Sequence, residues 1–321
     1  MPSRREFLHQ LGTGAAAGAL LPLGCVIRRA QSADDPQASS PAARPPRPAS
    51  LEIGYAAITW GGDDQRAIQD ISALGFRGIQ LRASVLTRYG DRPRELRELL
   101  ARHGLTFVAL SSGNVSIDPS AEARVIDEHV SHAKFLRDAG GLYLQLIDER
   151  PKGREVESAD YARLGRLLTE IGKRAADLGI QVGYHHHAGS MGETPVEIDR
   201  VLDASDPTYV RLLLDIAHYR VGGGDPVAAI HRYAQRLLFL HIKDVRGAAP
   251  GVAPLPASFQ FVELGRGSVN LPGVFAALRD LRFRGWAIVE LDSVTDPART
   301  PREAAAANKR YLEQVLGVRV N

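Results

Sequence analysis

Three consecutive histidines, His185, His186 and His187, follow an apolar run in the segment GYHHHAGS, residues 183–190. The whole chain contains 10 histidines, so this segment concentrates them. Imidazole changes its charge near neutral pH, acts as a general acid or base, and is the commonest metal ligand. The run therefore predicts a metal site or proton-transfer groups, and a polar loop without a function is the alternative.

Acids, histidines and a lysine follow other apolar runs in the same way. They are Asp148 with Glu149, Asp215 with His218, His241 with Lys243 and Asp244, and Glu290 with Asp292. One Asp, one His and one Glu supply the mixed nitrogen and oxygen ligands that suit Mn²⁺, Co²⁺, Zn²⁺ or Mg²⁺. Loop caps, or an ion-paired rim, are the alternatives. His129 and His132 are three residues apart on an expected helix, and we expect an exposed or packed helix face there rather than a metal site.

Eight apolar runs, each followed by a helical pattern, must position these residues. The expected strands are 51–60, 76–83, 105–113, 141–149, 180–187, 210–218, 237–244 and 285–292, and the helices 63–75, 92–104, 121–139, 158–178, 194–205, 225–235, 271–283 and 301–316. Near-continuous apolar strands that alternate with helices indicate a parallel α/β sheet buried on both faces. Eight such units predict a single (β/α)8 TIM barrel over residues 51–321. The first strand–helix turn, TWGGDDQ, has no phosphate-binding glycine pattern.

In such a barrel the catalytic residues lie at the carboxyl ends of the strands. Because side chains alternate along a strand, His185 and His187 should share one face, with His186 on the other. By the same reasoning His241 and Lys243 share a face. Asp215, His241 and Glu290 could then converge from neighbouring strands. The second and third strands end in LRAS and LSSGN, which contain neither carboxylate nor imidazole.

The ordered motifs GYHHHAG, LLLDIAH, FLHIKD, GRGSVN and WAIVELD resemble the xylose isomerase-like TIM-barrel superfamily over residues 51–317. The inosose dehydratase branch is the most similar, and sugar epimerases and proteins acting on 3-keto-glycosides are also similar. The resemblance implies one divalent metal held from strands five to eight, with Asp215, His241 and Glu290 as three ligands. The fourth position, a Glu in the family, is His185 here, and Glu149 or Asp148 are alternatives. A second departure is the loop of Arg266 and Asn270, where the family often has an acid.

The same resemblance implies an isomerase, epimerase or dehydratase that forms an enediolate from a keto-sugar, keto-cyclitol or 3-keto-glycoside. Mn²⁺ is the metal we expect, with Co²⁺, Mg²⁺ or Zn²⁺ as alternatives. The expected roles are His187 or His186 as base or acid, Lys243 as a cation near a substrate oxygen, His218 at substrate or a ligand, and Trp60 and Asp292 at substrate. Packing in the core is the alternative for Trp60.

Two other functions share the barrel. An endonuclease IV-like phosphodiesterase is disfavoured because strands two and three lack the histidines of a multi-zinc site. The chain has 40 basic and 37 acidic residues, but residues 1–50 hold six Arg and three acids, which leaves 34 of each sign in the remainder. A neutral domain does not predict nucleic-acid binding. A non-catalytic periplasmic sugar-binding protein is the other alternative, and a homo-oligomer or partner subunit is left open.

The N-terminus has the pattern of an export signal. SRREFLHQLG is a twin-arginine motif, and the weakly apolar LGTGAAAGALLPLG follows it. We expect residues 1–25 to form the signal, with either lipidation at Cys25 or cleavage near AQSA, residues 30–33. Residues 26–50, rich in Pro, Ala and Ser, are expected to be a disordered linker. The predicted location is the periplasm, with membrane contact only through the signal or a lipid.

Overall fold

The computed structural model describes residues 48, 50–247 and 259–320. The predictions for the signal, for Cys25 and for nearly all of the linker lie outside the described residues. Eight parallel strands form a closed barrel in the order β1-β10-β7-β6-β5-β4-β3-β2. This confirms the predicted TIM barrel. Among the described residues, no helix has the length and apolar character needed to cross a membrane.

The barrel strands agree with the apolar runs of the sequence. They are β1 (Leu51–Ala56), β2 (Gly78–Arg82), β3 (Thr106–Val115), β4 (Tyr143–Asp148), β5 (Gln181–His185), β6 (Val210–Asp215), β7 (Leu237–Ile242) and β10 (Gly285–Val289). Parallel pairing joins each strand to its neighbours, and β1 pairs with β10 from Leu51 opposite Gly285 onward to close the barrel.

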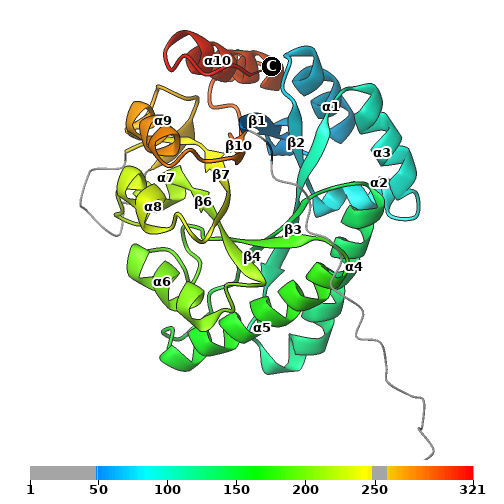
Figure 1. The fold of residues 1–321 in the computed structure, drawn as a ribbon, viewed down its shortest axis with the longest axis vertical. Helices are drawn as coiled ribbons and strands as arrows, with labels where there is room; N and C mark the ends of the chain where they lie inside the picture. Colours follow the sequence, from blue (N-terminus) through cyan, green and yellow to red (C-terminus); the bar gives the residue numbers. More distant parts are fainter. Residues whose placement is uncertain (1–47, 49, 248–258, 321) are drawn as a thin grey trace, which may run out of the picture. The chain divides into compact units, whose positions relative to one another are not determined.

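A ring of helices surrounds the strands in sequence order (Figure 1). It contains α1 (Asp64–Ala73), α3 (Pro93–Arg102), α4 (Glu122–Asp138), α5 (Ser158–Asp177), α6 (Pro195–Ala204), α8 (Pro226–Arg232), α9 (Leu271–Asp280) and α10 (Pro301–Gln314). Local sequence fixes where several of them begin. Thr194 and Thr300 each form a reciprocal capping box with a glutamate three residues later, and a proline follows each threonine.

Short elements that the sequence did not predict follow several strands. They are η1 (Ala57–Trp60), η2 (Ala83–Val85), α2 (Leu86–Tyr89), η3 (Pro119–Ala121), α7 (Ile216–Val221), and the antiparallel pair β8 (Asp244–Arg246) and β9 (Gln260–Val262). The expected strands 51–60 and 210–218 are therefore too long. Strand β6 ends at Asp215 because this carboxylate caps the following helix, with Oδ1 accepting hydrogen bonds from the amides of Ala217 and His218, both at 2.9 Å.

Apolar side chains pack in two places. The larger core lies between the strands and the helices, and a smaller cluster that includes Tyr143, Leu213, Phe239 and Trp286 fills the barrel interior. Tyr143 and Phe239 stack there with ring centroids 5.2 Å apart. Because side chains alternate along each strand, residues two positions further along the same strands point to the same side. The apolar cluster thus forms a floor beneath Gln145, Asp215 and His241.

Candidate metal centre and substrate cavity

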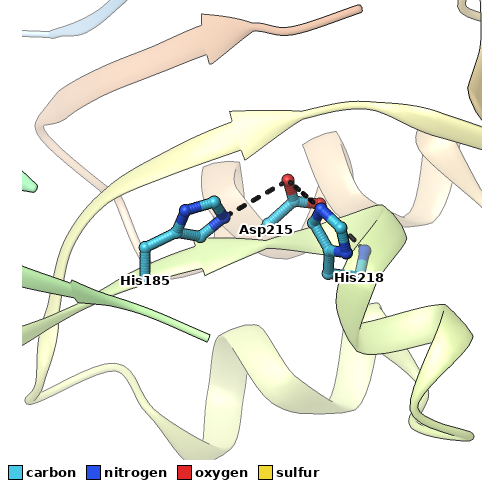
Figure 2. Close-up of side chains that lie close together, drawn as sticks. All are labelled: His185, Asp215 and His218. Carbon is cyan, nitrogen blue, oxygen red and sulfur yellow. Dashed lines mark hydrogen bonds and ion pairs between the residues drawn. The ribbon is translucent and has the colours of Figure 1, made fainter. Parts of the chain in front are cut away.

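Four side chains converge above this floor. The ligand atoms of Asp215 in β6, His241 in β7 and Glu290 just after β10 lie within 4.8 Å of one another. His241 Nδ1 is 3.4 Å from Asp215 Oδ2 and 3.5 Å from Glu290 Oε1. His185 Nε2, at the end of β5, is 3.6 Å from the same Asp215 oxygen. Figure 2 shows the Asp215 carboxylate between His185 and the ring of His218.

The separations between these atoms fit a divalent cation. In a tetrahedral site with metal–ligand distances of about 2.1 Å, the ligand atoms lie about 3.4 Å apart. His185 Nε2, Asp215 Oδ2 and His241 Nδ1 are all buried and have no hydrogen-bond partner. Buried polar atoms are nearly always paired. Three unpaired potential ligand atoms that face one another therefore indicate a cation site.

His218 forms an alternative cluster with His185 and Asp215. Its Nε2 lies 3.9 Å from Asp215 Oδ2, but its Nδ1 accepts a hydrogen bond from the Ala188 amide at 3.2 Å. A neutral imidazole carries its proton on the nitrogen that does not accept. Nε2 of neutral His218 then carries the proton, and it lies 3.5 Å from the Lys243 ammonium, a cation that disfavours a metal ion at this nitrogen. This favours His241 and Glu290 over His218 as the partners of Asp215 and His185.

Two buried glutamines, neither of them expected from the sequence, contact the histidines of this centre. Gln80 in β2 lies between His241 and Glu290. The amide nitrogen of Gln145 in β4 is 2.7 Å from His185 Nδ1, and its Oε1 has no hydrogen-bond partner. A 180° turn of this amide would present Oε1 to a protonated Nδ1 and leave the lone pair of His185 on Nε2, as a metal ligand requires. The available signal was a single polar residue inside an otherwise apolar strand, as in GIQLR and YLQLI.

The protonation states of the centre suit cation binding. Burial lowers the pKa of His185 to about 4, so its imidazole is neutral at pH 7. Burial alone would raise the pKa of Glu290, but His241 and Lys243 lower it to about 2. The pKa of Asp215 is likewise well below its usual value, since His218 and Lys243 outweigh burial. Neutral imidazoles and ionised carboxylates are the forms that bind metals.

Lys243 contacts the carboxylates of the centre and is not among the residues that line the cavity. Its side chain is fully buried, and Nζ is 3.0 Å from Glu290 Oε1 and 2.6 Å from Asp292 Oδ1. Burial opposes its charge, but Glu290, Asp215 and Asp292 raise its pKa above the usual value. Asp215, Glu290 and Asp292 are three carboxylates against this one ammonium, which leaves two negative charges for a divalent cation. Lys243 does not itself line the cavity, but both of its nearest carboxylates do, so its expected place near a substrate oxygen stays a prediction.

A cavity of about 310 Å³ opens beside the centre at the carboxyl ends of the strands. His185 and Glu290 contribute to its wall, so the candidate ligands are reachable from it. Most of the remaining lining is polar: Gln80, Arg82, Ser84, Ser111, Asn114, Gln145, His187 and Asp292. Hydroxyls, amides and one guanidinium are suited to a small molecule that carries several oxygens.

His187 is the imidazole that lines the cavity without belonging to the candidate ligand set. Its Nδ1 lies 2.8 Å from the Ala188 carbonyl oxygen, to which it donates, and this leaves the lone pair on Nε2. The ring lies against His218, with centroids 3.8 Å apart. His218 is buried and does not line the cavity, so it supports His187 instead of contacting substrate. The predicted sharing of a face by His185 and His187 agrees with this arrangement.

His186 and Trp60, both predicted at the site, do not line the cavity. His186 points to the opposite side of β5, where it is fully buried, its Nε2 accepts from the Asp215 amide at 3.2 Å, and burial lowers its pKa to about 3. The expectation that His186 transfers protons is therefore wrong. Trp60 is buried against Tyr55 and donates from Nε1 to Asp70 at 3.0 Å. It packs in the core, the alternative we considered, because Asp70 provides its polar partner.

Neither alternative for the fourth ligand, Asp148 or Glu149, reaches the centre. Asp148 accepts from the Tyr184 hydroxyl at 2.6 Å and from the Met191 amide, and so fixes the loop after β5. Glu149 is partly exposed and lies 3.8 Å from Lys152. Of the three candidates for the fourth ligand, only His185 lies beside Asp215.

The remaining polar residues of the motifs have structural partners. Asp244 accepts from the amides of Gly265, Gly267 and Val269 at 2.9–3.1 Å and thereby holds the loop that precedes α9. In that loop Arg266 pairs with Glu263, and Asn270 caps α9.

His129 and His132 both bond to Ser112 Oγ, at 2.7 and 2.8 Å. This places them between α4 and β3, as expected for packing residues.

Within the part of the chain that the structure describes, fold and site together define a TIM barrel with one candidate metal centre at the carboxyl ends of its strands. The chain belongs to the family described as Xylose isomerase-like TIM barrel, whose sequence model matches residues 68–315. It is 27% identical over 312 residues to an inosose dehydratase of Lacticaseibacillus casei, covering 84% of this chain and 98% of that protein. It is 30% identical over 280 residues to the rhizopine catabolism protein MocC of Rhizobium meliloti, covering 76% of this chain and 82% of that protein.

Solved structures agree with the fold. The crystal structure of IOLI protein with a bound zinc atom superposes with a TM-score of 0.71 at 18% identity and covers 83% of this chain and 98% of that one. A probable 3-DHS dehydratase of Bacillus anthracis, AsbF, gives a TM-score of 0.66 at 16% identity over 81% of this chain and 98% of that one.

Proposed function

We propose that this chain is a divalent-metal-dependent dehydratase that acts on a keto-cyclitol or a closely related keto-sugar. The observation that carries the proposal is the convergence of three unpaired buried ligand atoms beside a polar cavity. The similarity to inosose dehydratases over 84% of the chain favours dehydration of a cyclic polyol ketone over the other reactions of this fold.

His185, Asp215, His241 and Glu290 would hold the metal. Two imidazoles and two carboxylates suit Mn²⁺, Co²⁺ or Zn²⁺, and we propose Mn²⁺ first. When bound, the cation would act as a Lewis acid on the ketone and stabilise negative charge on oxygen as an α-proton leaves. Both candidate clusters among the described residues share Asp215 and so form a single centre. This favours single-metal chemistry over the multi-zinc site of an endonuclease IV-like phosphodiesterase.

The chain's own residues supply the proton transfers. His187 Nε2 removes the proton from the carbon next to the ketone, and the electron pair forms the enediolate. Collapse of the enediolate breaks the bond from the β-carbon to its hydroxyl, and the proton taken by His187 leaves with this hydroxyl as water. Asp292, which lines the cavity and is held by Lys243 at 2.6 Å, accepts hydrogen bonds from substrate hydroxyls.

The test is incubation of the protein and Mn²⁺ in D₂O with an inosose and with a panel of keto-sugars. A product lighter by one water supports the proposal. Deuterium uptake without loss of water would indicate an epimerase or isomerase. Binding without exchange or product would refute catalysis and favour a sugar-binding protein.

We also propose that the protein is exported through the twin-arginine route and works in the periplasm. Support comes from the sequence SRREFLHQLG. Replacement of Arg4 and Arg5 by lysine should retain the protein in the cytoplasm in a cell-fractionation assay. Unchanged export of this double variant would refute the proposal.

A further inference from the structure

Gln80 is an uncharged polar residue buried in the middle of β2. Its exposed fraction is 4%, and its neighbours in the strand, Ile79 and Leu81, are fully buried. A buried amide costs free energy unless its donor and acceptor are both paired. The partners of this amide are therefore informative about why the strand contains it.

Both ends of the Gln80 amide are bonded to candidate metal ligands. Oε1 lies 2.9 Å from His241 Nε2, and Nε2 donates to Glu290 Oε2 at 3.3 Å. An amide oxygen can only accept, so His241 must carry a proton on Nε2. A neutral His241 then has its lone pair on Nδ1. That atom has no hydrogen-bond partner and lies 3.5 Å from Glu290 Oε1, the oxygen that Gln80 does not occupy.

We propose that Gln80 is a positioning residue of the metal centre, which selects Nδ1 of His241 as the ligand atom and aims one Glu290 oxygen at the cation. A single amide thereby fixes one ligand in β7 and one just after β10. The inference rests on the metal site of the proposed function, but it does not depend on the substrate.

Other side chains at position 80 would lose one part of this arrangement. Glutamate accepts from His241 but cannot donate to Glu290 when ionised, and it adds a third carboxylate close to Asp215 and Glu290. Asparagine is one methylene too short to span both partners. Methionine has nearly the same length and volume, but it neither donates nor accepts at these positions, and it leaves His241 Nε2–H buried without a partner.

Gln80→Met therefore removes the amide while preserving the packing. We expect Co²⁺ affinity, measured by chelator competition, to fall by about 10–100-fold, the usual effect of losing a hydrogen bond to a ligand. The visible absorption bands of bound Co²⁺ should also change, which a role in packing alone would not cause. Gln181→Met is the matched control, because Gln181 lies at the opposite end of a barrel strand, and its affinity and spectrum should equal those of the parent protein.

Affinity within twofold of the parent and an unchanged Co²⁺ spectrum in Gln80→Met would overturn the inference. If this variant does not fold, ¹⁵N NMR of the Zn²⁺-loaded parent decides the question. A proton on His241 Nε2 with Nδ1 bound to Zn²⁺ supports the inference, and the reverse assignment overturns it. A parent protein that binds no Co²⁺ refutes the proposed function, whereas normal parent binding with an unaffected Gln80→Met refutes only the role of Gln80.

Discussion

Replacement of Lys243 by methionine should destabilise the metal-free protein more than the metal-loaded protein. Lys243 Nζ is fully buried, 3.0 Å from Glu290 Oε1 and 4.0 Å from Asp215 Oδ2. Methionine keeps most of the side-chain volume but leaves these carboxylates without their cation. Loss of one partner from a buried ion pair exposes the full cost of burying the other charge.

The magnitude follows from the geometry. At 3.0 Å and an effective dielectric constant of about 20, the Lys243–Glu290 attraction is about 5.5 kcal/mol. The cost of burying the ammonium, several kcal/mol, opposes it, and broken buried pairs typically lose about 3–5 kcal/mol. The pair with Asp292 adds little, because that side chain is 38% exposed and solvent screens it. We therefore expect the free energy of unfolding in chelator to fall by about 3–5 kcal/mol.

The assay is denaturant unfolding followed by circular dichroism, in chelator and in saturating Mn²⁺. In Mn²⁺ the cation replaces the lost positive charge, so the loss should be smaller, and the variant should bind Mn²⁺ more tightly than the parent. The control is Lys173→Met, since Lys173 is exposed with Nζ 5.8 Å from the Tyr209 ring centroid, and its loss should be within about 0.5 kcal/mol. An equal loss for Lys243→Met in both conditions would refute the electrostatic reasoning.

Three further predictions concern the base, the loop anchor and a buried histidine. His187→Asn should reduce kcat by about 10²–10⁴-fold, because it removes the proton acceptor. The metal content, measured by mass spectrometry, should stay unchanged, because His187 is not in the ligand set. Asp244→Ala should lower the free energy of unfolding by about 3 kcal/mol, because several backbone amides lose a charged acceptor; thermal unfolding measures this. Burial lowers the pKa of His129 to about 4 from 6.5, so the unfolded chain binds a proton between these values that the folded protein does not. The stability that its neutral form contributes is complete above pH 6.5 and is lost as the pH falls to 4. The total loss is about 3 kcal/mol. His129→Gln should abolish this part of the pH dependence of the unfolding free energy, measured by urea titration.

Each of these has a result that would contradict it. Loss of metal from His187→Asn would make His187 a ligand instead of a base. Asp280→Ala is the control for Asp244→Ala, since Asp280 is exposed at a helix end, and equal effects of the two changes would argue against the anchor. If the free energy of unfolding depends on pH in the same way in the parent and in His129→Gln, the His129 ring does not titrate as its burial implies.

The barrel itself could be predicted from the sequence because its strands are buried on both faces and alternate regularly with helices. The convergence of Asp215, His241 and Glu290 followed from the same pattern, since strand ends share one edge and side chains alternate. The element boundaries were less accessible. Strand β6 ends at Asp215 because its carboxylate accepts a hydrogen bond from the amide of His218. The pattern of apolar residues in the sequence does not predict this cap.

The errors at the site come from contacts between distant parts of the chain. Trp60 packs in the core, where its indole N–H donates to Asp70. The sequence also does not show that Lys243 bonds to Glu290 and Asp292, which follow it by some 50 residues. Gln80 was missed because a single amide has no charge or spacing that marks it, and its partner His241 lies 161 residues away.

One backbone segment determines the proton positions of two imidazoles. The Ala188 amide donates to His218 Nδ1, and the Ala188 carbonyl accepts from His187 Nδ1. Neither bond involves the side chain at position 188, so point substitutions there other than proline, which lacks the N–H, keep both bonds. An insertion or deletion in this loop would displace both peptide groups at once. The loop after β5 can therefore change its residues as related enzymes evolve. Its length is constrained, because the hydrogen bonds of Ala188 to His187 and His218 must be kept.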